Sequence, residues 1–175
     1  MQKGTITKFK WYWAWQDEKE EAWLIEMASQ GYHFDGFVFP TLYRFIKSDP
    51  AEVVYRMDFP STGKKDRQAY LQLFKDTGWE HVCEMGGWVY FRRQIQPGEP
   101  TEIFTDVESK VRKYQRVLMY LIIFLPIWLV VRPNFEANSM TLFDNVVFVL
   151  YTAMTLLWAV AIINLIRRVR QLQGS

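Results

Sequence analysis

A long stretch near the C-terminal end of the chain, almost free of charge, constrains the fold more than any other feature. Between Val117 and Ile166 the only charged residues are Arg132, Glu136 and Asp144. Residues 1–116 contain 17 of the 21 basic and 17 of the 19 acidic side chains, so that part has no formal net charge. Helices on the surface of a soluble protein keep a polar face, and this stretch shows none. We therefore expect a water-soluble part followed by a part in the lipid bilayer.

The uncharged stretch divides into two apolar runs. The first, Val117 to Val131, is 15 residues long and covers about 22 Å of a hydrocarbon core of about 30 Å. Because the run is too short to cross alone, we expect flanking residues to extend it into a transmembrane helix over 114–132. The second run, Val146 to Ile166, has 21 residues and is expected to cross unaided within a helix over 142–166. The short loop at 133–141 predicts an antiparallel transmembrane hairpin.

Basic residues at the ends of the two runs predict the orientation. Seven positive charges flank the runs on their outer ends, against Arg132 alone in the connecting loop: Lys110, Arg112, Lys113, Arg116, Arg167, Arg168 and Arg170. The positive-inside rule then places both termini in the cytoplasm, with 167–175 as a basic cytosolic tail. A multi-pass protein of the cell membrane is expected. The lone Cys83 excludes an internal disulfide and suits a reducing compartment.

Internal similarity marks the first hundred residues. Ala22-Trp23-Leu24 and Ala69-Tyr70-Leu71 each begin nine residues before a Gly followed by an aromatic residue. Extended segments and a turn follow in both places, so one unit is predicted to occur twice, at about 8–48 and 52–94. Each copy is expected to fold as strand, helix, strand, strand.

This tandem βαββ repeat predicts an α+β domain over 1–96. We expect one antiparallel sheet of about six strands with two helices on one face, joined to the membrane part by a linker and helical stalk at 97–113. Strands are expected at 8–13 and 52–59, and helices at 17–30 and 65–77, each ended by a glycine. Asp17 is expected to cap the first helix, and Gly86-Gly87 to form a hairpin turn.

Strand alternation predicts which side chains lie under the helices. Tyr43, Phe45, Tyr55, Met57, Val89 and Phe91 are expected there. The opposite face is then aromatic and charged, and it is the candidate ligand or partner site, formed by Tyr12, Arg44, Arg56, Asp58, Trp88, Tyr90 and Arg92. Aromatic rings would stack there and arginines would pair with charge. Equally open is that the stalk, a second copy of the domain or the bilayer surface covers this face.

Catalytic and metal-binding patterns are not found in the sequence. His33 and His81 occupy non-equivalent places in the two copies, and no nucleophile lies in a recognisable pairing with a base. We expect no enzyme activity, no metal and no cofactor. Nucleic acid is not an expected partner, because the first part has no net positive charge.

Several segments resemble a bacterial family catalogued as domain of unknown function 2812 (DUF2812). The similar segments are DEKEEAWLIEMASQGYHF (Asp17–Phe34), YRF (Tyr43–Phe45), VVYRMDF (Val53–Phe59), YLQLFKDTGWEHV (Tyr70–Val82) and GGWVYFRR (Gly86–Arg93). The resemblance implies a membrane protein of Gram-positive type, often encoded beside a PadR-type transcriptional regulator. It therefore implies a regulatory protein partner, and it offers no catalytic residues.

Two functions follow as expectations. The first is a two-span bacterial membrane protein whose cytosolic domain is a non-enzymatic sensor or regulatory binding module for a ligand or a transcriptional regulator. Tandem strand-helix-strand-strand units are similar in fold to effector-binding domains of some bacterial regulators. The alternative is a structural or accessory subunit that forms a homo-oligomer through its transmembrane hairpin.

Overall fold

The computed structural model describes residues 4–61, 66–95, 103, 107–130 and 141–174, without the side chains of 127–129. The chain divides into two compact units, Met1–Ser109 and Lys110–Ser175. We call the first the α+β unit and the second the helical unit, and each is described by itself.

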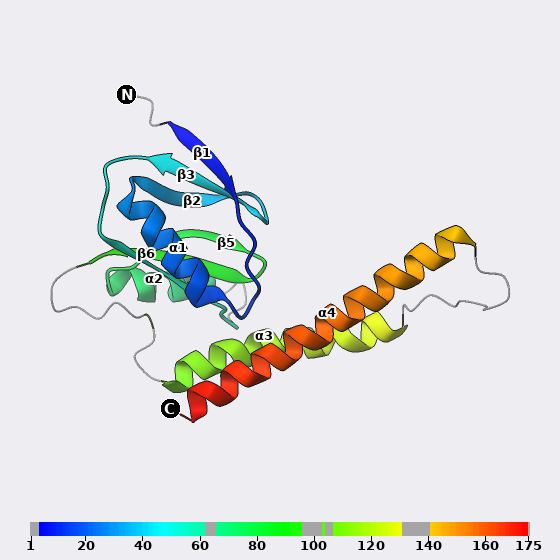
Figure 1. Cartoon of the computed structure of the whole chain (residues 1–175). Helices are drawn as coiled ribbons and strands as arrows, with labels where there is room; N and C mark the ends of the chain where they lie inside the picture. Colours follow the sequence, from blue (N-terminus) through cyan, green and yellow to red (C-terminus); the bar gives the residue numbers. More distant parts are fainter. Residues whose placement is uncertain (1–3, 62–65, 96–102, 104–106, 131–140, 175) are drawn as a thin grey trace. The chain divides into compact units, whose positions relative to one another are not determined.

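Among its described residues up to 95, the α+β unit has six strands and two helices. In chain order these are β1 (Thr5–Phe9), α1 (Asp17–Ser29), β2 (Tyr32–Phe39), β3 (Leu42–Lys47), β4 (Val53–Asp58), α2 (Arg67–Asp76), β5 (Glu80–Met85) and β6 (Trp88–Gln94). The mixed α+β class is confirmed. The strands form two three-stranded antiparallel sheets, in the orders β1-β3-β2 and β4-β6-β5 (Figure 1). That the two halves are copies of one repeat stays a prediction.

The expectation of one continuous sheet is wrong, and the edge strands explain why. β2 and β5 are edge strands of their sheets and lie close to each other, since a Cβ placed on Gly36 would be 3.7 Å from Cβ of Cys83. Both strands have irregular register, between Phe34 and Gly36 in β2 and between His81 and Cys83 in β5. Such bulges twist an edge and interrupt its row of hydrogen-bonding groups. The two edges therefore meet without pairing.

Local signals place the helices and the hairpin well. α1 ends just before Gly31, whose φ of +84° is the left-handed conformation expected after a helix. α2 ends close to Gly78, and Gly86-Gly87 forms the turn between β5 and β6. Asp17 is not the helix cap, since Gln16 occupies that position and Asp17 is the first helical residue.

The first strand lies earlier than expected. β1 ends at Phe9, and residues 10–16 leave the sheet before α1 begins. Phe9 and Trp11 are 68% and 55% exposed. The aromatic alternation at 8–13 resembles a strand, but its rings lie along a connecting segment at the start of α1.

The faces of the second sheet are partly as expected. Val89 and Phe91 on β6 pack with Phe74 of α2, as predicted. Tyr55 and Met57 lie under a helix as predicted, but under α1 and on the opposite face from Val89 and Phe91, because directly paired residues share a face and these two pair with Arg92 and Tyr90. β4 is buried on both faces, so the alternation of apolar and charged residues along it did not show which side faces α2. Arg56 and Asp58 consequently share the face of Phe91 and Val89.

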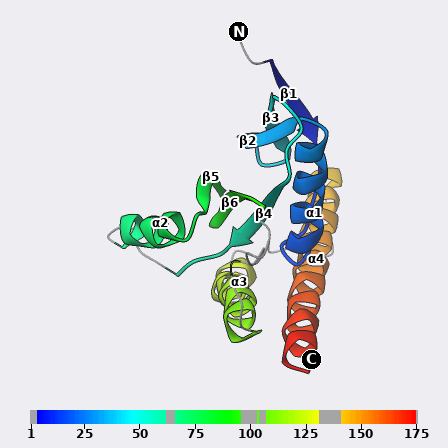
Figure 2. The same cartoon turned by 90° about the vertical axis from the view of Figure 1, so that its left-hand side faces the viewer.

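On β4 and β6, the predicted open sheet face is not open in the part of the chain that the structure describes. The side of β4 and β6 that points away from α2 is buried in a core shared with α1 and the first sheet. This core contains Leu24, Met27, Phe34, Tyr43, Phe45, Tyr55, Met57 and Tyr90. Figure 2 shows the second sheet between α1 and α2. The first sheet and α1 thus cover the side of the second sheet that carries Tyr90, one of the residues predicted to be free.

The helical unit is formed by α3 (Val107–Val130) and α4 (Leu142–Gln173). Pro126 lies inside α3. The N-terminus of α4 has a capping box, in which the amide of Asp144 donates to Oγ1 of Thr141 and the amide of Thr141 donates to the Asp144 carboxylate. The guanidinium of Arg168 on α4 lies 5.8 Å from the ring centroid of Tyr114 on α3.

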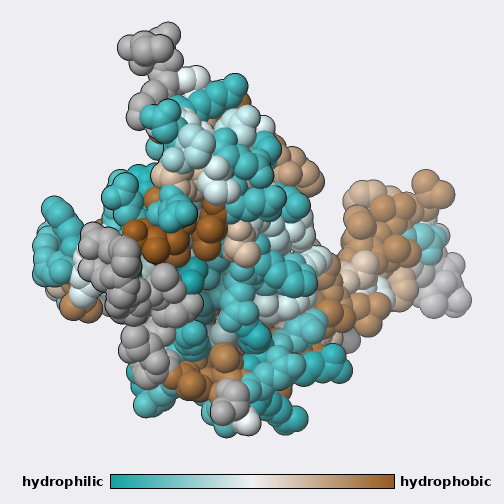
Figure 3. Space-filling model, turned by 60° about the vertical axis from the view of Figure 1, so that its left-hand side comes forward, coloured by the Kyte–Doolittle hydropathy of each residue, from teal (hydrophilic) through white to brown (hydrophobic). Residues whose placement is uncertain are grey.

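By length and composition alone, α4 is the one helix among the described residues that could cross a membrane. Its most apolar window is not buried in the structure. In Figure 3 the α+β unit has a largely hydrophilic teal surface, whereas the helical unit displays extended brown hydrophobic surface. The predicted loop at 133–141 lies, except for Thr141, outside the described residues, and the transmembrane hairpin stays a prediction.

Candidate functional site

A pocket of about 280 Å³ lies at the N-terminal end of α1, between elements of both sheets. We call it the Glu20 pocket. Its aromatic lining comes from the segment before α1 and from the strands β2, β3 and β6, and consists of Trp11, Tyr12, Trp13, Phe37, Tyr43, Trp88 and Tyr90. Met57 and Met85 add thioethers to the wall. Such a predominantly aromatic wall with few polar groups is typical of sites for small organic molecules.

Two tyrosines from different sheets meet on one carboxylate oxygen. The hydroxyls of Tyr43 on β3 and Tyr90 on β6 each donate a hydrogen bond of 2.8 Å to Oε1 of Glu20. The ring of Phe37 lies 4.7 Å from that of Tyr43 and 5.3 Å from that of Tyr90. Glu20 therefore joins α1 to both sheets at the wall of the pocket.

Glu20 is a buried acid whose carboxylate forms no ion pair among the described residues. Its exposed fraction is 5%, and among the described residues no Lys, Arg or His lies within ion-pair distance of its carboxylate. Burial raises its pKa, the hydrogen bonds from Tyr43 and Tyr90 lower it, and the charge of Asp17 raises it further, with a net increase. The positive end of the α1 dipole supports a carboxylate in this first turn.

The phenols and the thiol near Glu20 stay protonated at neutral pH. Burial and the charge of Glu20 raise the pKa of Tyr43 and of Tyr90 well above the ordinary value, and the pKa of Tyr12 rises to about 12. Burial, together with Asp35, raises the pKa of Cys83 to about 12. A protonated thiol is a poor nucleophile, so this cluster favours binding and does not supply an activated group.

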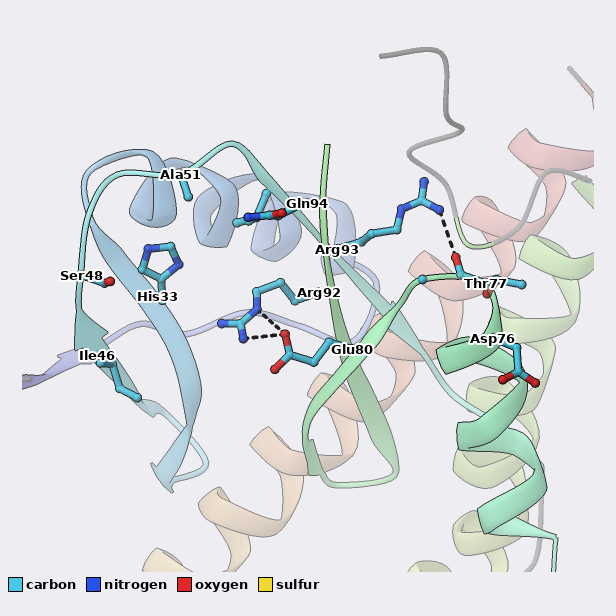
Figure 4. Close-up of a pocket in the computed structure, with 12 residues that line it drawn as sticks. His33, Ile46, Ser48, Ala51, Asp76, Thr77, Glu80, Arg92, Arg93 and Gln94 are labelled. Carbon is cyan, nitrogen blue, oxygen red and sulfur yellow. Dashed lines mark hydrogen bonds and ion pairs between the residues drawn. The ribbon is translucent and has the colours of Figure 1, made fainter. Parts of the chain in front are cut away.

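A second, wider pocket of about 810 Å³ lies on another part of the α+β unit (Figure 4). Nη2 of Arg92 is 2.7 Å from Oε2 of Glu80, and Nη1 of Arg93 donates to the carbonyl oxygen of Thr77 at 3.3 Å. Nε2 of His33 is 2.8 Å from the carbonyl oxygen of Asp49. Several charged and polar groups that line this pocket are thus engaged with neighbouring groups of the protein.

The predicted site residues do not form one surface. Tyr12, Trp88 and Tyr90 line the Glu20 pocket, whereas Arg92 lines the second pocket. Arg44 forms an exposed ion pair of 2.8 Å with Asp35.

Arg56 and Asp58 have structural partners. Nη1 of Arg56 donates to the carbonyl oxygen of Tyr55 at 2.8 Å and lies 3.5 Å from Oε2 of Glu21. Asp58 is buried and accepts a hydrogen bond from the hydroxyl of Tyr70 on α2. These two residues hold α1 and α2 against β4.

Glu20 itself, with Tyr43, was not predicted as part of a site. The acids at the start of α1 look like a solvated first turn. The helical period nevertheless contained the signal, because Glu20 precedes the buried residues Leu24, Met27 and Ala28 by four, seven and eight positions. An acid on the buried stripe of a helix needs a partner or a function.

Comparison with known proteins identifies the family. The family model described as "Protein of unknown function (DUF2812)" matches residues 16–125, more than half of the chain. No curated protein and no solved structure gives a significant match. The matched range contains α1, α2, β2 to β6 and much of α3, and so includes most of the Glu20 pocket. The chain therefore belongs to the DUF2812 family.

Proposed function

We propose that this protein is a membrane-anchored, non-enzymatic binding module that senses a small organic molecule in the Glu20 pocket. The observation that carries the proposal is a 5% exposed carboxylate without a basic partner among the described residues, at the wall of an aromatic pocket. A buried, unpaired acid is costly to a fold. A role in ligand binding gives a reason for that cost.

Binding is favoured over catalysis by the protonation states in the pocket. The phenols of Tyr43 and Tyr90 remain neutral and are both engaged with Glu20. General acid–base catalysis works best with groups whose pKa lies near the operating pH. These phenols and the Cys83 thiol have pKa values displaced away from neutrality, while an aromatic wall supplies contact area for a ligand.

The binding experiment uses the full-length protein in a mild non-ionic detergent. A library of small organic molecules is screened by the rise in Tm and by quenching of tryptophan fluorescence, because Trp11, Trp13 and Trp88 line the pocket. Trp88→Ala should weaken the binding of every molecule that the screen identifies. Arg44→Ala, in an exposed ion pair outside the pocket lining, is the control and should bind like the wild type. If the molecules bind Trp88→Ala with unchanged affinity, the ligand binds elsewhere and the proposal is refuted.

We further propose that α3 and α4 form a transmembrane hairpin in the cell membrane, with both termini in the cytoplasm. The apolar side chains of α4 are exposed along most of its length. Arg167, Arg168 and Arg170 follow the apolar part and suit the cytoplasmic side. Green fluorescent protein fused after Ser175 should fluoresce, and alkaline phosphatase fused there should be inactive. An active phosphatase would indicate a single crossing by α4.

A regulatory partner and a duplicated origin belong to the same proposal. In both halves of the α+β unit the strands of the sheet lie in the order first, third, second. This shared order supports descent from one βαββ unit. A PadR-type regulator is the partner that the family resemblance suggests. Co-purification of that regulator with the full chain, changed by a hit from the screen, would support signalling. Co-purification that no hit changes would argue for a constitutive complex.

The exposed apolar surface of α4 also favours a second candidate, a structural subunit that oligomerises within the membrane. Light scattering of the full chain in detergent distinguishes the two. A stable oligomer that Val149→Arg or Leu156→Arg dissociates would support the structural role, and a monomer would argue against it.

A further inference from the structure

The ionisable lining of the Glu20 pocket is acidic. Asp17 and Glu20 are its acids, both at least nine-tenths buried, and Lys10 is its base. Nζ of Lys10 lies 5.7 Å from the ring centroid of Trp23, so its charge already has a partner. An anionic ligand would meet the buried carboxylate of Glu20, while the ammonium of Lys10 is already engaged with a ring. The charge balance therefore disfavours anions.

One oxygen of Glu20 remains available to a ligand. Both hydrogen bonds to the Glu20 carboxylate reach Oε1, and among the described residues none reaches Oε2. A carboxylate can accept about four hydrogen bonds or close electrostatic contacts. A neutral ligand would leave the buried negative charge without compensation, whereas a cation would supply it directly.

The rest of the wall suits a cation that carries apolar substituents. Aromatic rings attract cations through the negative electrostatic potential of their faces, and thioethers such as those of Met57 and Met85 are polarisable. The hydroxyls of Tyr43 and Tyr90 are occupied by Glu20. A primary ammonium would need several acceptors for its three N–H donors. A fully alkylated nitrogen needs none and buries its methyl groups against the rings.

We propose that the Glu20 pocket selects free organic cations of the quaternary ammonium type, with the positive charge beside Glu20 and an apolar or aromatic substituent against the surrounding rings. This inference rests on the proposed function, which assigns the ligand to this pocket. The volume of about 280 Å³ lies at the small end of ligand pockets. A single-ring cation is therefore the expected size.

Shape-matched probes separate charge from size. Phenyltrimethylammonium and tert-butylbenzene have nearly the same shape and differ in one positive charge. Benzenesulfonate supplies an anion, and phosphocholine tests whether the source of the cation is a lipid headgroup, whose phosphate would meet Asp17 and Glu20. Equilibrium dialysis of the full-length protein in non-ionic detergent, with a detergent-only blank, gives the free concentration of each probe.

Two variants are matched in chemistry and burial. Glu20→Gln removes the charge and keeps an oxygen that can accept from the tyrosines. Glu21→Gln is the control, because Glu21 is also buried on α1 but does not line the pocket. We expect phenyltrimethylammonium to bind the wild type and Glu21→Gln at least about tenfold more tightly than tert-butylbenzene does. In Glu20→Gln this preference should fall to about one, with tert-butylbenzene binding unchanged.

Titration of the wild type gives a test that does not depend on a variant. Glu20 faces Lys10, Tyr12, Asp17, Tyr43, Cys83 and Tyr90. The tyrosines and the thiol stay protonated as the pH is lowered from neutrality. Binding of phenyltrimethylammonium should weaken as Glu20 is protonated, while binding of tert-butylbenzene should not change. Glu20→Gln should remove this pH dependence, and a pH dependence that persists in this variant would have another source than Glu20.

Each result decides a different point. Equal binding of the cation and its neutral isostere, or an unchanged preference in Glu20→Gln, would overturn cation selection and leave the pocket as a ligand site. Tighter binding of phosphocholine than of phenyltrimethylammonium would overturn the assignment to a free cation. Failure of every probe to bind the wild type would also overturn the inference. The proposed function would then stand or fall on the library screen with Trp88→Ala.

Discussion

Glu20 shows how a single residue can connect stability with binding. Its carboxylate is buried, accepts two tyrosine hydrogen bonds and has no basic partner among the described residues. Residues at functional sites are often less favourable for the fold than an alternative side chain would be. Both the pH dependence of stability and the role of the tyrosines follow from this arrangement.

Glu20→Gln should stabilise the ligand-free protein, and more so at high pH. The pKa of Glu20 is raised in the folded protein from its ordinary value of 4.5, so above that pH the folded state holds a proton that the unfolded state has lost. The stability from this difference is fully present below 4.5 and is lost as the pH rises through the folded-state pKa. Gln has no such loss. Melting curves from pH 4.5 to 8 should show a growing Tm difference, and a constant difference would contradict the prediction.

Removal of a tyrosine hydroxyl should have the opposite effect. Tyr90→Phe leaves Glu20 with one of its two hydrogen bonds and should reduce the free energy of unfolding by about 1–3 kcal/mol at neutral pH. The loss should be smaller in the Glu20→Gln background, because the acceptor is then uncharged. Urea unfolding of the two single variants and the double variant measures this coupling. Additive effects would show that Tyr90 acts independently of Glu20.

At the scale of elements, the position of the site depends on how α1 packs against both sheets. α1 packs against both β2 and β4, and its first turn brings Asp17 and Glu20 to the pocket. The angle of α1 is fixed at its other end by Gly31, where the chain turns into β2. A Cβ at Gly31 would be 2.6 Å from the carbonyl oxygen of Ser48. This glycine is therefore required for space as well as for conformation.

Gly31→Ala should destabilise the protein more than Gly86→Ala. Both positions have positive φ, at 84° and 58°, which costs a residue with a side chain about 1–2 kcal/mol. Gly86 has open space where a Cβ would lie, so it should show the conformational cost alone. Gly31→Ala adds a clash with backbone. Denaturant midpoints of the two variants measure the difference, and equal midpoints would mean that the backbone near Ser48 moves aside at no cost.

At the scale of the whole molecule, the exposed apolar side chains of α4 support the proposed place of the helical unit in the membrane. Val149 and Leu156 of α4 are 62% and 63% exposed in the structure. Exposed apolar side chains at this density are unfavourable in water and favourable in lipid. The α+β unit has its own core, so we expect it to depend on the bilayer less than α4 does.

Charged substitutions in the middle of α4 test its surroundings. Leu156→Arg should cost about 2.5–3.5 kcal/mol of insertion free energy if this position lies in the membrane core. Leu142→Arg, at the first residue of α4, is the matched control and should cost less, because the interface tolerates a charge. The fraction of the full chain in the membrane pellet after ultracentrifugation reports both. If Leu156→Arg leaves that fraction unchanged, α4 does not lie in the bilayer core.

The sequence by itself determined what depends on neighbours along the chain. The helices α1 and α2, their ends near Gly31 and Gly78, the Gly86-Gly87 turn and the apolar stretch of α4 were all predictable. Periodicity, turn chemistry and hydropathy are local properties, and local physics is enough to place them.

Tertiary structure alone decided the pairing of the strands and the site. β4 is buried on both faces, so the alternation of Tyr55 and Met57 with Arg56 and Asp58 did not show which side would face α2. Irregular edges kept β2 and β5 from joining into one sheet. Glu20, Tyr43 and Tyr90 are up to 70 residues apart in the chain, and their contact exists only because α1 lies across both sheets. Burial and charge balance are sums over such distant neighbours, which a linear pattern does not contain.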